Sequence, residues 1–164
     1  SVSDVTVTDT VTETNLLSFS VPANTLSTAN AIKVELYISD LDFNSDSTTD
    51  LTIRLKYGST TLATATITES RSGSSTNSSG KIEAILYANA ATNAQEGVLM
   101  AQFFGSVLLA ENNQDVGNAV GDVGVGTAAE DSTGALNLVV SVQWGVALTT
   151  NSITMSNYLA TKFV

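Results

Sequence analysis

Apolar residues recur at every second position along much of this chain. Successive side chains of a β-strand point to opposite faces, so this period gives a strand one buried face and one wetter face. Ile32, Val34, Leu36 and Ile38 show the period most clearly, because Lys, Glu and Tyr stand between them. The period therefore predicts β-structure. The other segments that share it are residues 51–57, 62–68, 136–146 and 153–159.

Two of these segments flank a short turn sequence. Tyr57-Gly58-Ser59-Thr60 stands between residues 51–57 and 62–68, which predicts that the two segments pair as a β-hairpin. Farther along the chain, Trp144 falls in the apolar register of residues 136–146. That register predicts that the indole anchors the core and is not an exposed platform for a sugar.

Other segments are less regular. Residues 4–11 and 15–22 are expected to form two short strands or one long bent strand. Lys81–Asn89 is expected to form a strand. Val98–Ala110 fits a buried strand or a short helix, and its two Phe residues and lack of helix caps favour the strand. Ala88–Glu96 is rich in Ala and Asn, which is consistent with a helical turn.

Two stretches are predicted to be loops. Ser70–Gly80 consists almost entirely of Ser, Gly, Thr and Asn, and Glu111–Gly134 is rich in Asn, Asp and Gly. The second is long for a compact domain, and long loops are often functional. No linker divides the 164 residues, so we expect a single domain over residues 1–164.

These elements together indicate an all-β protein. Eight or nine strands with long connections are typical of an antiparallel sandwich of two sheets. A jelly roll is the form expected at this size. An immunoglobulin-like sandwich is the alternative, although the cysteine pair that joins the sheets of many such domains is missing here.

Composition excludes several classes of chemistry. The chain has no Cys and no His, which excludes disulfide scaffolds, Cys/His zinc sites and every Ser-His or Cys-His catalytic arrangement. Ser and Thr supply 43 of the 164 residues, whereas only 13% are charged, so hydroxyl groups must form much of the polar surface. The absence of Cys also suits assembly in a reducing cytoplasm.

The balance of charge excludes further partners. The formal net charge is −10, so the phosphate backbone of a nucleic acid and an anionic lipid surface would repel the protein. No apolar run approaches the roughly 18 residues that span a bilayer, and residues 1–4 do not resemble a secretion leader. We therefore expect neither nucleic acid nor membrane as a partner.

One acidic segment resembles a degenerate calcium loop. Oxygen-bearing side chains occupy its alternate positions, namely Asp40, Asp42, Asn44 and Asp46. Alternate oxygen ligands are what a calcium loop requires. However, Ser45 stands where such a loop needs Gly, and Leu51 stands where it needs a bidentate Glu. An acidic turn without metal is the simpler interpretation.

Neither a cofactor site nor an enzyme site emerges from the remaining motifs. Gly117, Gly121, Gly124 and Gly126 do not follow the order of a phosphate-binding loop, so they predict a flexible or extended arm. A glycosidase would need two carboxylates across an aromatic-lined cleft, and no such pairing is visible. We therefore expect no cofactor and no enzymatic activity.

Three segments carry a resemblance to known proteins. Residues 12–26 (TETNLLSFSVPANTL) resemble the opening strand and turn of jelly-roll virion proteins of tailed bacteriophages. Residues 51–63 resemble the hairpin that follows in these proteins. Residues 136–164, with the pieces VQWG and NSITMSNY, are similar to their last two strands. Residues 70–134 match no pattern of this group.

The resemblance implies a small structural protein of the virion, assembled in the host cytoplasm and often trimeric. Capsid decoration is the favoured role, because the sequence contains no fibre shaft, and the expected partners are the major capsid protein and further copies of the chain. The alternatives are a head, neck or tail fibre, or a carbohydrate-binding module that recognises a receptor. The segments expected to hold the capsid or another subunit are an N-terminal arm (residues 1–14) and the loop over residues 111–134. The candidate contact residues in them are Val5, Val7, Val11, Asn113, Asp115, Val120 and Asp122.

Overall fold

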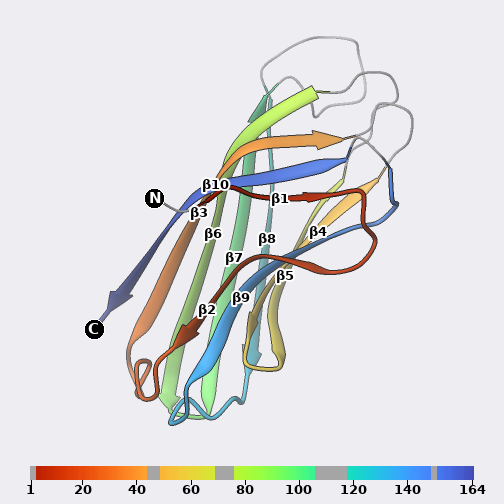
Figure 1. Cartoon of the computed structure of the whole chain (residues 1–164). Coiled ribbons are helices and arrows are strands. Elements are labelled where there is room, and N and C mark those ends of the chain that lie inside the picture. Colours follow the sequence, from red (N-terminus) through yellow and green to blue (C-terminus); the bar gives the residue numbers. More distant parts are fainter. Residues whose placement is uncertain (1–2, 44–48, 69–75, 106–117, 149–150) are drawn as a thin grey trace.

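The structure is a computed structural model that describes residues 3–43, 49–68, 76–105, 118–148 and 151–164. Over these residues the chain forms strands and turns and no helix (Figure 1). Consequently, no helix in the described part is long and apolar enough to cross a membrane. The strands are β1 (Val5–Thr8), β2 (Thr14–Val21), β3 (Ala31–Phe43), β4 (Asp50–Tyr57), β5 (Thr60–Thr68), β6 (Thr76–Ala91), β7 (Ala94–Gly105), β8 (Asn118–Ala128), β9 (Leu136–Trp144) and β10 (Ser152–Phe163).

The strands form two antiparallel sheets that pack face to face. The six-stranded sheet has the order β1-β10-β3-β6-β7-β8, and the four-stranded sheet has the order β2-β9-β4-β5. Pairing is nested along the chain: β4 pairs with β5, β3 with β6, β2 with β9 and β1 with β10. These nested pairs alternate between the two sheets, which is the winding of a jelly roll. The prediction of an antiparallel sandwich of jelly-roll type is confirmed, with ten strands in the described residues in place of eight or nine.

The core lies between the inner faces of the two sheets. Apolar side chains at alternate positions of β3, β4 and β9 are fully buried there, as the period-2 pattern predicts. Phe43 and Trp144 meet edge to face, with ring centroids 5.3 Å apart and an interplanar angle of 87°. The prediction that Trp144 anchors the core is therefore confirmed.

Strand β8 corrects the prediction of a loop over residues 111–134. Residues 118–128 pair with β7, so β7 and β8 follow β6 in the six-stranded sheet and β8 is its edge strand. Glycines face inward along this strand and bring it close to the edge strand β5. A Cβ atom at Gly124 would collide with the carbonyl oxygen of Thr64, and one at Gly126 would collide with that of Leu62. Glycine at these positions thus permits backbone to pack on backbone.

Two other predictions need correction. In place of the helical turn expected over residues 88–96, the structure has the end of β6, a two-residue turn at residues 92–93 and the start of β7; Ala90, with a φ of 58°, lies in the irregular last part of β6. The expected loop over residues 70–80 is wrong from Thr76 onward, because β6 begins there and pairs with β3. Residues 69–75 and 106–117 lie outside the described residues. The uncertain segment over residues 98–110 is a strand as far as it is described, to Gly105.

A buried polar network closes the end of the sandwich at which β6 joins β7. The Gln95 side chain is 1% exposed; its amide donates to the carbonyl oxygens of Thr92 and Glu130, and its oxygen accepts from the Glu130 amide. The Ser132 hydroxyl donates to the same Thr92 carbonyl at 2.7 Å. A carboxylate oxygen of Glu130 in turn accepts from the Ser59 amide in the β4–β5 turn at 3.0 Å. Three connections are therefore fixed together at this end.

Candidate interaction surface

The side chains of β10, β3, β6, β7 and β8 that point away from the four-stranded sheet form what we call the outer face. The strand register places them in rows across the sheet. One row is Thr161, Lys33, Ile85, Val98 and Val125. The next row is Leu159, Glu35, Glu83, Met100 and Val123.

Four charged side chains form a closed square of ion pairs at the middle of the outer face. Glu35 and Glu83 lie directly opposite each other on β3 and β6, and two lysines bridge them. Lys33 Nζ lies 2.9 Å from a carboxylate oxygen of Glu83 and 3.4 Å from one of Glu35. Lys81 Nζ lies 3.0 Å from an oxygen of each. The square neutralises two carboxylates that would otherwise repel each other across the strands.

The square shifts the pKa values of its members. Burial raises the pKa of Glu83, but hydrogen bonds from Lys33 and Lys81 outweigh it, and the net pKa lies below the ordinary value of 4.5. The hydrogen bond to Glu83 raises the pKa of Lys33, and that to Glu35 raises the pKa of Lys81. All three shifts favour the charged forms, so the square is held together over a wide pH range.

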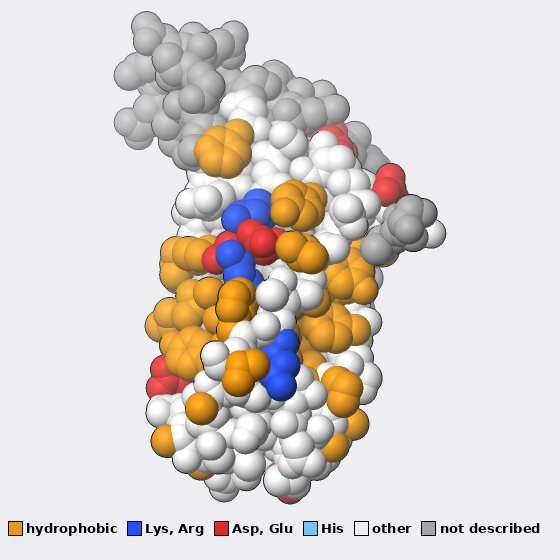
Figure 2. Space-filling model, turned by 90° about the vertical axis from the view of Figure 1, so that its left-hand side faces the viewer, with side chains coloured by type: hydrophobic (Ala, Val, Ile, Leu, Met, Phe, Trp, Pro, Cys, Tyr) orange, Lys and Arg blue, Asp and Glu red, His pale blue; other side chains and the backbone are white. Residues whose placement is uncertain are grey.

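Apolar side chains surround this square. Among the described residues, nine large apolar side chains are at least 43% exposed, and six of them lie on the outer face. Figure 2 shows the charged cluster with hydrophobic side chains around it. Several exposed apolar side chains gathered on one sheet face and bordered by polar groups make that face a candidate interaction surface. The six side chains are Tyr37, Phe104, Val123, Val125, Leu159 and Phe163.

The middle of the outer face carries no net charge. Besides the four members of the square, which sum to zero, the charged side chains of this face within the described residues are Asp40, Asp42 and Glu96, so the face sums to −3. The whole chain has a net charge of −10. The three carboxylates that give the sum for the face lie towards its two ends, Asp40 and Asp42 at one end and Glu96 at the other, so an acidic partner would meet least repulsion from this face over its neutral middle.

The opposite face of the sandwich is different in character. The outward side chains of β4 and β5 are largely Thr, with Arg54 and Lys56 among them. Glu13 crosses onto this face, where one carboxylate oxygen accepts from the Ser141 hydroxyl at 2.6 Å and from Lys56 Nζ at 3.0 Å. The hydrogen bond from Ser141 is the main cause of the lowered pKa of Glu13. These bonds hold the segment before β2 against β9 and β4.

The residues predicted to contact the capsid or another subunit do not lie together in the structure. The N-terminal segment is part of the sandwich: β1 pairs with β10, and the carbonyl oxygen of Val11 accepts from the Gln143 side chain. Val7 is 3% exposed and packs in the core, whereas Val5 is partly buried and Val11 is 48% exposed. Val120 is partly buried on β8. Asn113 and Asp115 lie outside the described residues.

Asp122 has a structural contact. One of its carboxylate oxygens accepts from the Thr66 amide at 2.7 Å, and the other accepts from the Val123 amide at 2.8 Å. The first bond joins β8 to β5 and fixes the position of β8 at the edge of the outer face. The predicted role of Asp122 in contact with a capsid or subunit remains a prediction.

Of the four candidate calcium ligands, two lie on a strand and two lie outside the described residues. Asp40 and Asp42 belong to β3, and a carboxylate oxygen of Asp40 accepts from the Ser152 hydroxyl at 3.2 Å. Asn44 and Asp46 lie outside the described residues. Within the described part of the chain, no group of three or more acidic side chains is placed to hold a metal ion.

Sequence reasoning missed the outer face, although a signal for it exists. The tripeptide Lys-x-Glu occurs at residues 33–35 and again at residues 81–83, both times within an alternating apolar segment. Each tripeptide places a lysine and a glutamate on one face of a strand. Only the pairing of β3 with β6 shows that the two tripeptides lie side by side.

No protein-family model matches this chain, and no curated protein matches it. Among solved structures, the chain is similar to the CBM2 module of the evolved Dit of Lactobacillus casei BL23 phage J-1, with 12% identity over 80% of this chain and 69% of that chain and a TM-score of 0.25. It is also similar to the marine PL7 alginate lyase AlyA1 from Zobellia galactanivorans, with 8% identity over 91% of this chain and 66% of that chain and a TM-score of 0.25. Both TM-scores are low, so the fold assignment rests on the strand pairing of this chain itself.

Proposed function

We propose that this chain is a non-enzymatic structural protein of a tailed-bacteriophage virion, which decorates the capsid and binds the major capsid protein through its outer face. The observation that carries the proposal is the combination of six exposed apolar side chains with a neutral ion-pair square on one sheet. The sequence resemblance to phage virion proteins supplies the kind of assembly in which such a face would be used.

The geometry of the outer face suits a flat contact between proteins. The apolar side chains of β7 and β8 lie together, because Val98 is opposite Val125 and Met100 is opposite Val123. Apolar area of this kind supplies binding energy when water leaves it, at roughly 25 cal/mol per Å². The square beside it adds polar groups that are already paired, so burying it against a partner leaves few charges without a partner.

A carbohydrate-binding module is the second candidate. Its support is that Tyr37 and Phe104 expose 43% and 56% of their surface on the outer face. Exposed aromatic rings are the groups on which sugar rings stack. This candidate predicts that Tyr37→Ala abolishes binding to an oligosaccharide, whereas capsid decoration predicts no oligosaccharide binding by the unaltered chain.

The proposal is tested by binding the purified chain to capsids of the encoding phage that lack it. Val125→Lys places a charge in the apolar part of the outer face, where Val125 is 73% exposed in the free chain. Thr64→Lys is the matched control, because it adds the same charge to an exposed position of β5 on the opposite face. We expect Val125→Lys to weaken co-sedimentation with capsids at least tenfold and Thr64→Lys to leave it unchanged. Equal binding by both variants, or no binding by the unaltered chain, would contradict the proposal.

A further inference from the structure

Strand β10 has a partner on only one side along much of its length. It pairs with β3 over nearly all of its residues, but β1 covers its other side only from Ser152 to Met155. Over residues 156–163 no strand of the described chain pairs with that side. Alternate backbone N–H and C=O groups there are directed to solvent, and an uncovered edge of this kind is a template for another strand.

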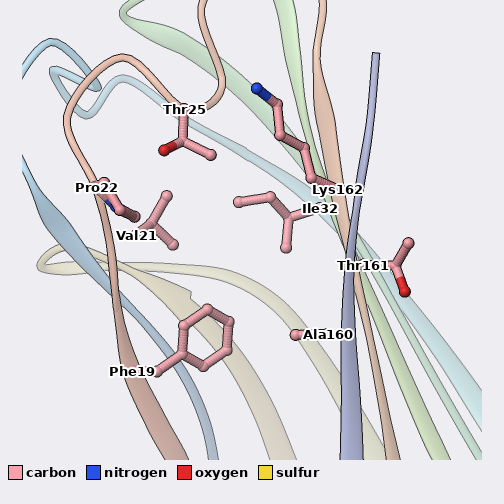
Figure 3. Close-up of a pocket in the computed structure, with 8 residues that line it drawn as sticks. All are labelled: Phe19, Val21, Pro22, Thr25, Ile32, Ala160, Thr161 and Lys162. Carbon is pink, nitrogen blue, oxygen red and sulfur yellow. The ribbon is translucent and has the colours of Figure 1, made fainter.

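An open apolar groove runs beside this edge. The groove has a volume of about 180 Å³ and lies between β10 and the segment formed by β2 and the turn after it (Figure 3). Phe19 and Tyr158 close one part of the gap between the sheets, since their rings stack with centroids 6.4 Å apart. The groove is lined by Phe19, Val21, Pro22, Thr25, Ile32, Ala160, Thr161 and Lys162. Its floor is therefore apolar and one of its walls is the uncovered strand.

The charge of the edge is unusual for this chain. Residues 156–163 contain Lys162 and no carboxylate, although the whole chain carries 16 Asp and Glu residues. Within the described residues the ion pairs involve Lys33, Arg54, Lys56 and Lys81, and none involves Lys162. Acidic repulsion between two copies is consequently weak at this edge.

We infer that a second copy of the chain occupies this edge, with the two β10 strands antiparallel about a twofold axis near Ala160. Side chains on the outer face must then lie opposite side chains on the outer face of the second copy, because paired residues of antiparallel strands share a face. Ala160 lies near the middle of the uncovered residues 156–163, and with the axis there Leu159 lies opposite Thr161, Tyr158 opposite Lys162, and Ala160 opposite its own copy.

The arrangement is complementary to itself. Each Lys162 ammonium lies beside the Tyr158 ring of the second copy, a pairing that attracts through the ring's negative face. Strand β10 of each copy covers the groove of the other copy, because the same surface of both copies forms a twofold interface. Because β1 covers only Ser152–Met155, it does not obstruct the second strand.

Pairing at this edge would extend the proposed interaction surface. Two six-stranded sheets would become one continuous sheet, and the two outer faces would lie side by side. The inference does not depend on the proposed function, because it concerns only the association of the chain with itself.

The test is the molar mass of the purified chain in solution, measured by light scattering over a series of concentrations. We expect a concentration-dependent dimer with twice the chain mass of 17.0 kDa. Ala160→Lys is the diagnostic variant: Ala160 is exposed, so the monomer tolerates the change, but like charges then meet on the twofold axis. We expect it to weaken dimerisation at least tenfold. Thr127→Lys, at an exposed position of β8, is the control and is expected to dimerise normally.

Hydrogen exchange supplies a second measurement. The amides of residues 156–163 that point away from β3 should become protected as concentration rises, while exposed amides elsewhere should not. A monomer at every concentration, a trimer, or a dimer unaffected by Ala160→Lys would overturn the inference. None of these results would bear on capsid binding, which is measured separately with capsids.

Discussion

A carboxylate oxygen of Asp122 accepts a hydrogen bond from the backbone amide of Thr66 at 2.7 Å, across the gap between the two sheets. Thr66 lies on β5, the edge strand of the four-stranded sheet, and Asp122 lies on β8, the edge strand of the six-stranded sheet. The backbone amide of Thr66, on an edge of the four-stranded sheet that no strand covers, thus finds its acceptor in the six-stranded sheet. It closes one side of the sandwich, whereas the other side stays open beside β10.

Removing this bond should destabilise the fold. In Asp122→Ala the amides of Thr66 and Val123 both lose their acceptor, and we expect the free energy of unfolding to fall by about 1–2 kcal/mol. Asp122→Asn is the intermediate variant: its single amide oxygen can accept from one of the two backbone amides, whereas its NH2 group cannot accept from the other, so it should cost less than Asp122→Ala without being neutral. Urea denaturation followed by circular dichroism measures both, and equal stability of Asp122→Ala and the unaltered chain would contradict this role.

The close approach of β8 to β5 should make Gly124 intolerant of a side chain. A Cβ there would meet the backbone of Thr64, so β8 would have to move. We expect Gly124→Val to lower the free energy of unfolding by at least about 2 kcal/mol. In Gly134→Ala the new Cβ would lie 3.8 Å from the carbonyl oxygen of Asp131, an ordinary contact, so this control should be nearly neutral. Thermal unfolding of the two variants provides the comparison, and similar melting temperatures would contradict the account.

The ion-pair square should make stability depend on pH. The pKa of Glu83 is lowered in the folded state, so its contribution is present above the ordinary value of 4.5 and is lost as pH falls through the lower, folded value. The pKa values of Lys33 and Lys81 are raised, so their contribution is present below 10.5 and is lost as pH rises through the higher, folded values. We expect Glu83→Gln to flatten the acid limb of the curve of stability against pH. Denaturation midpoints at a series of pH values measure this, and parallel curves for the two proteins would refute it.

The single tryptophan should report the integrity of the core. Trp144 is fully buried against Phe43, so its emission should be blue-shifted and insensitive to iodide in the native protein. Unfolding should shift the emission to the red and make it quenchable at the same denaturant concentration at which circular dichroism is lost. Iodide quenching of the native emission would show that the indole is not in the core.

Local patterns in the sequence were sufficient for much of the fold. The hairpin of β4 and β5 follows from two alternating segments and the Gly58-Ser59 turn, and the core position of Trp144 follows from its register. Strand β8 was missed because its inner face consists partly of glycine, which offers no apolar alternation to detect. Glycine is required at these positions because the backbone of β5 lies against them and leaves no room for a Cβ atom. That contact joins residues far apart in the sequence, so the sequence pattern does not reveal it.

The outer face was harder to foresee for the same reason. Lys33 and Glu35 are visible as neighbours on one strand, and so are Lys81 and Glu83 on another. Their assembly into a square depends on the register of β3 against β6, which is set by the nested winding of the whole chain. Similarly, the uncovered edge of β10 follows from the shortness of β1, and the strand pattern alone does not show which strand lies beside which.

The proposal that a tailed bacteriophage encodes this chain is tested most directly by the number of copies of the chain in purified particles of that phage, measured by mass spectrometry against the major capsid protein. Decoration of the capsid lattice through the outer face predicts hundreds of copies per particle. A few to tens of copies would place the chain at a vertex, neck or tail, and complete absence from particles would contradict a virion role altogether.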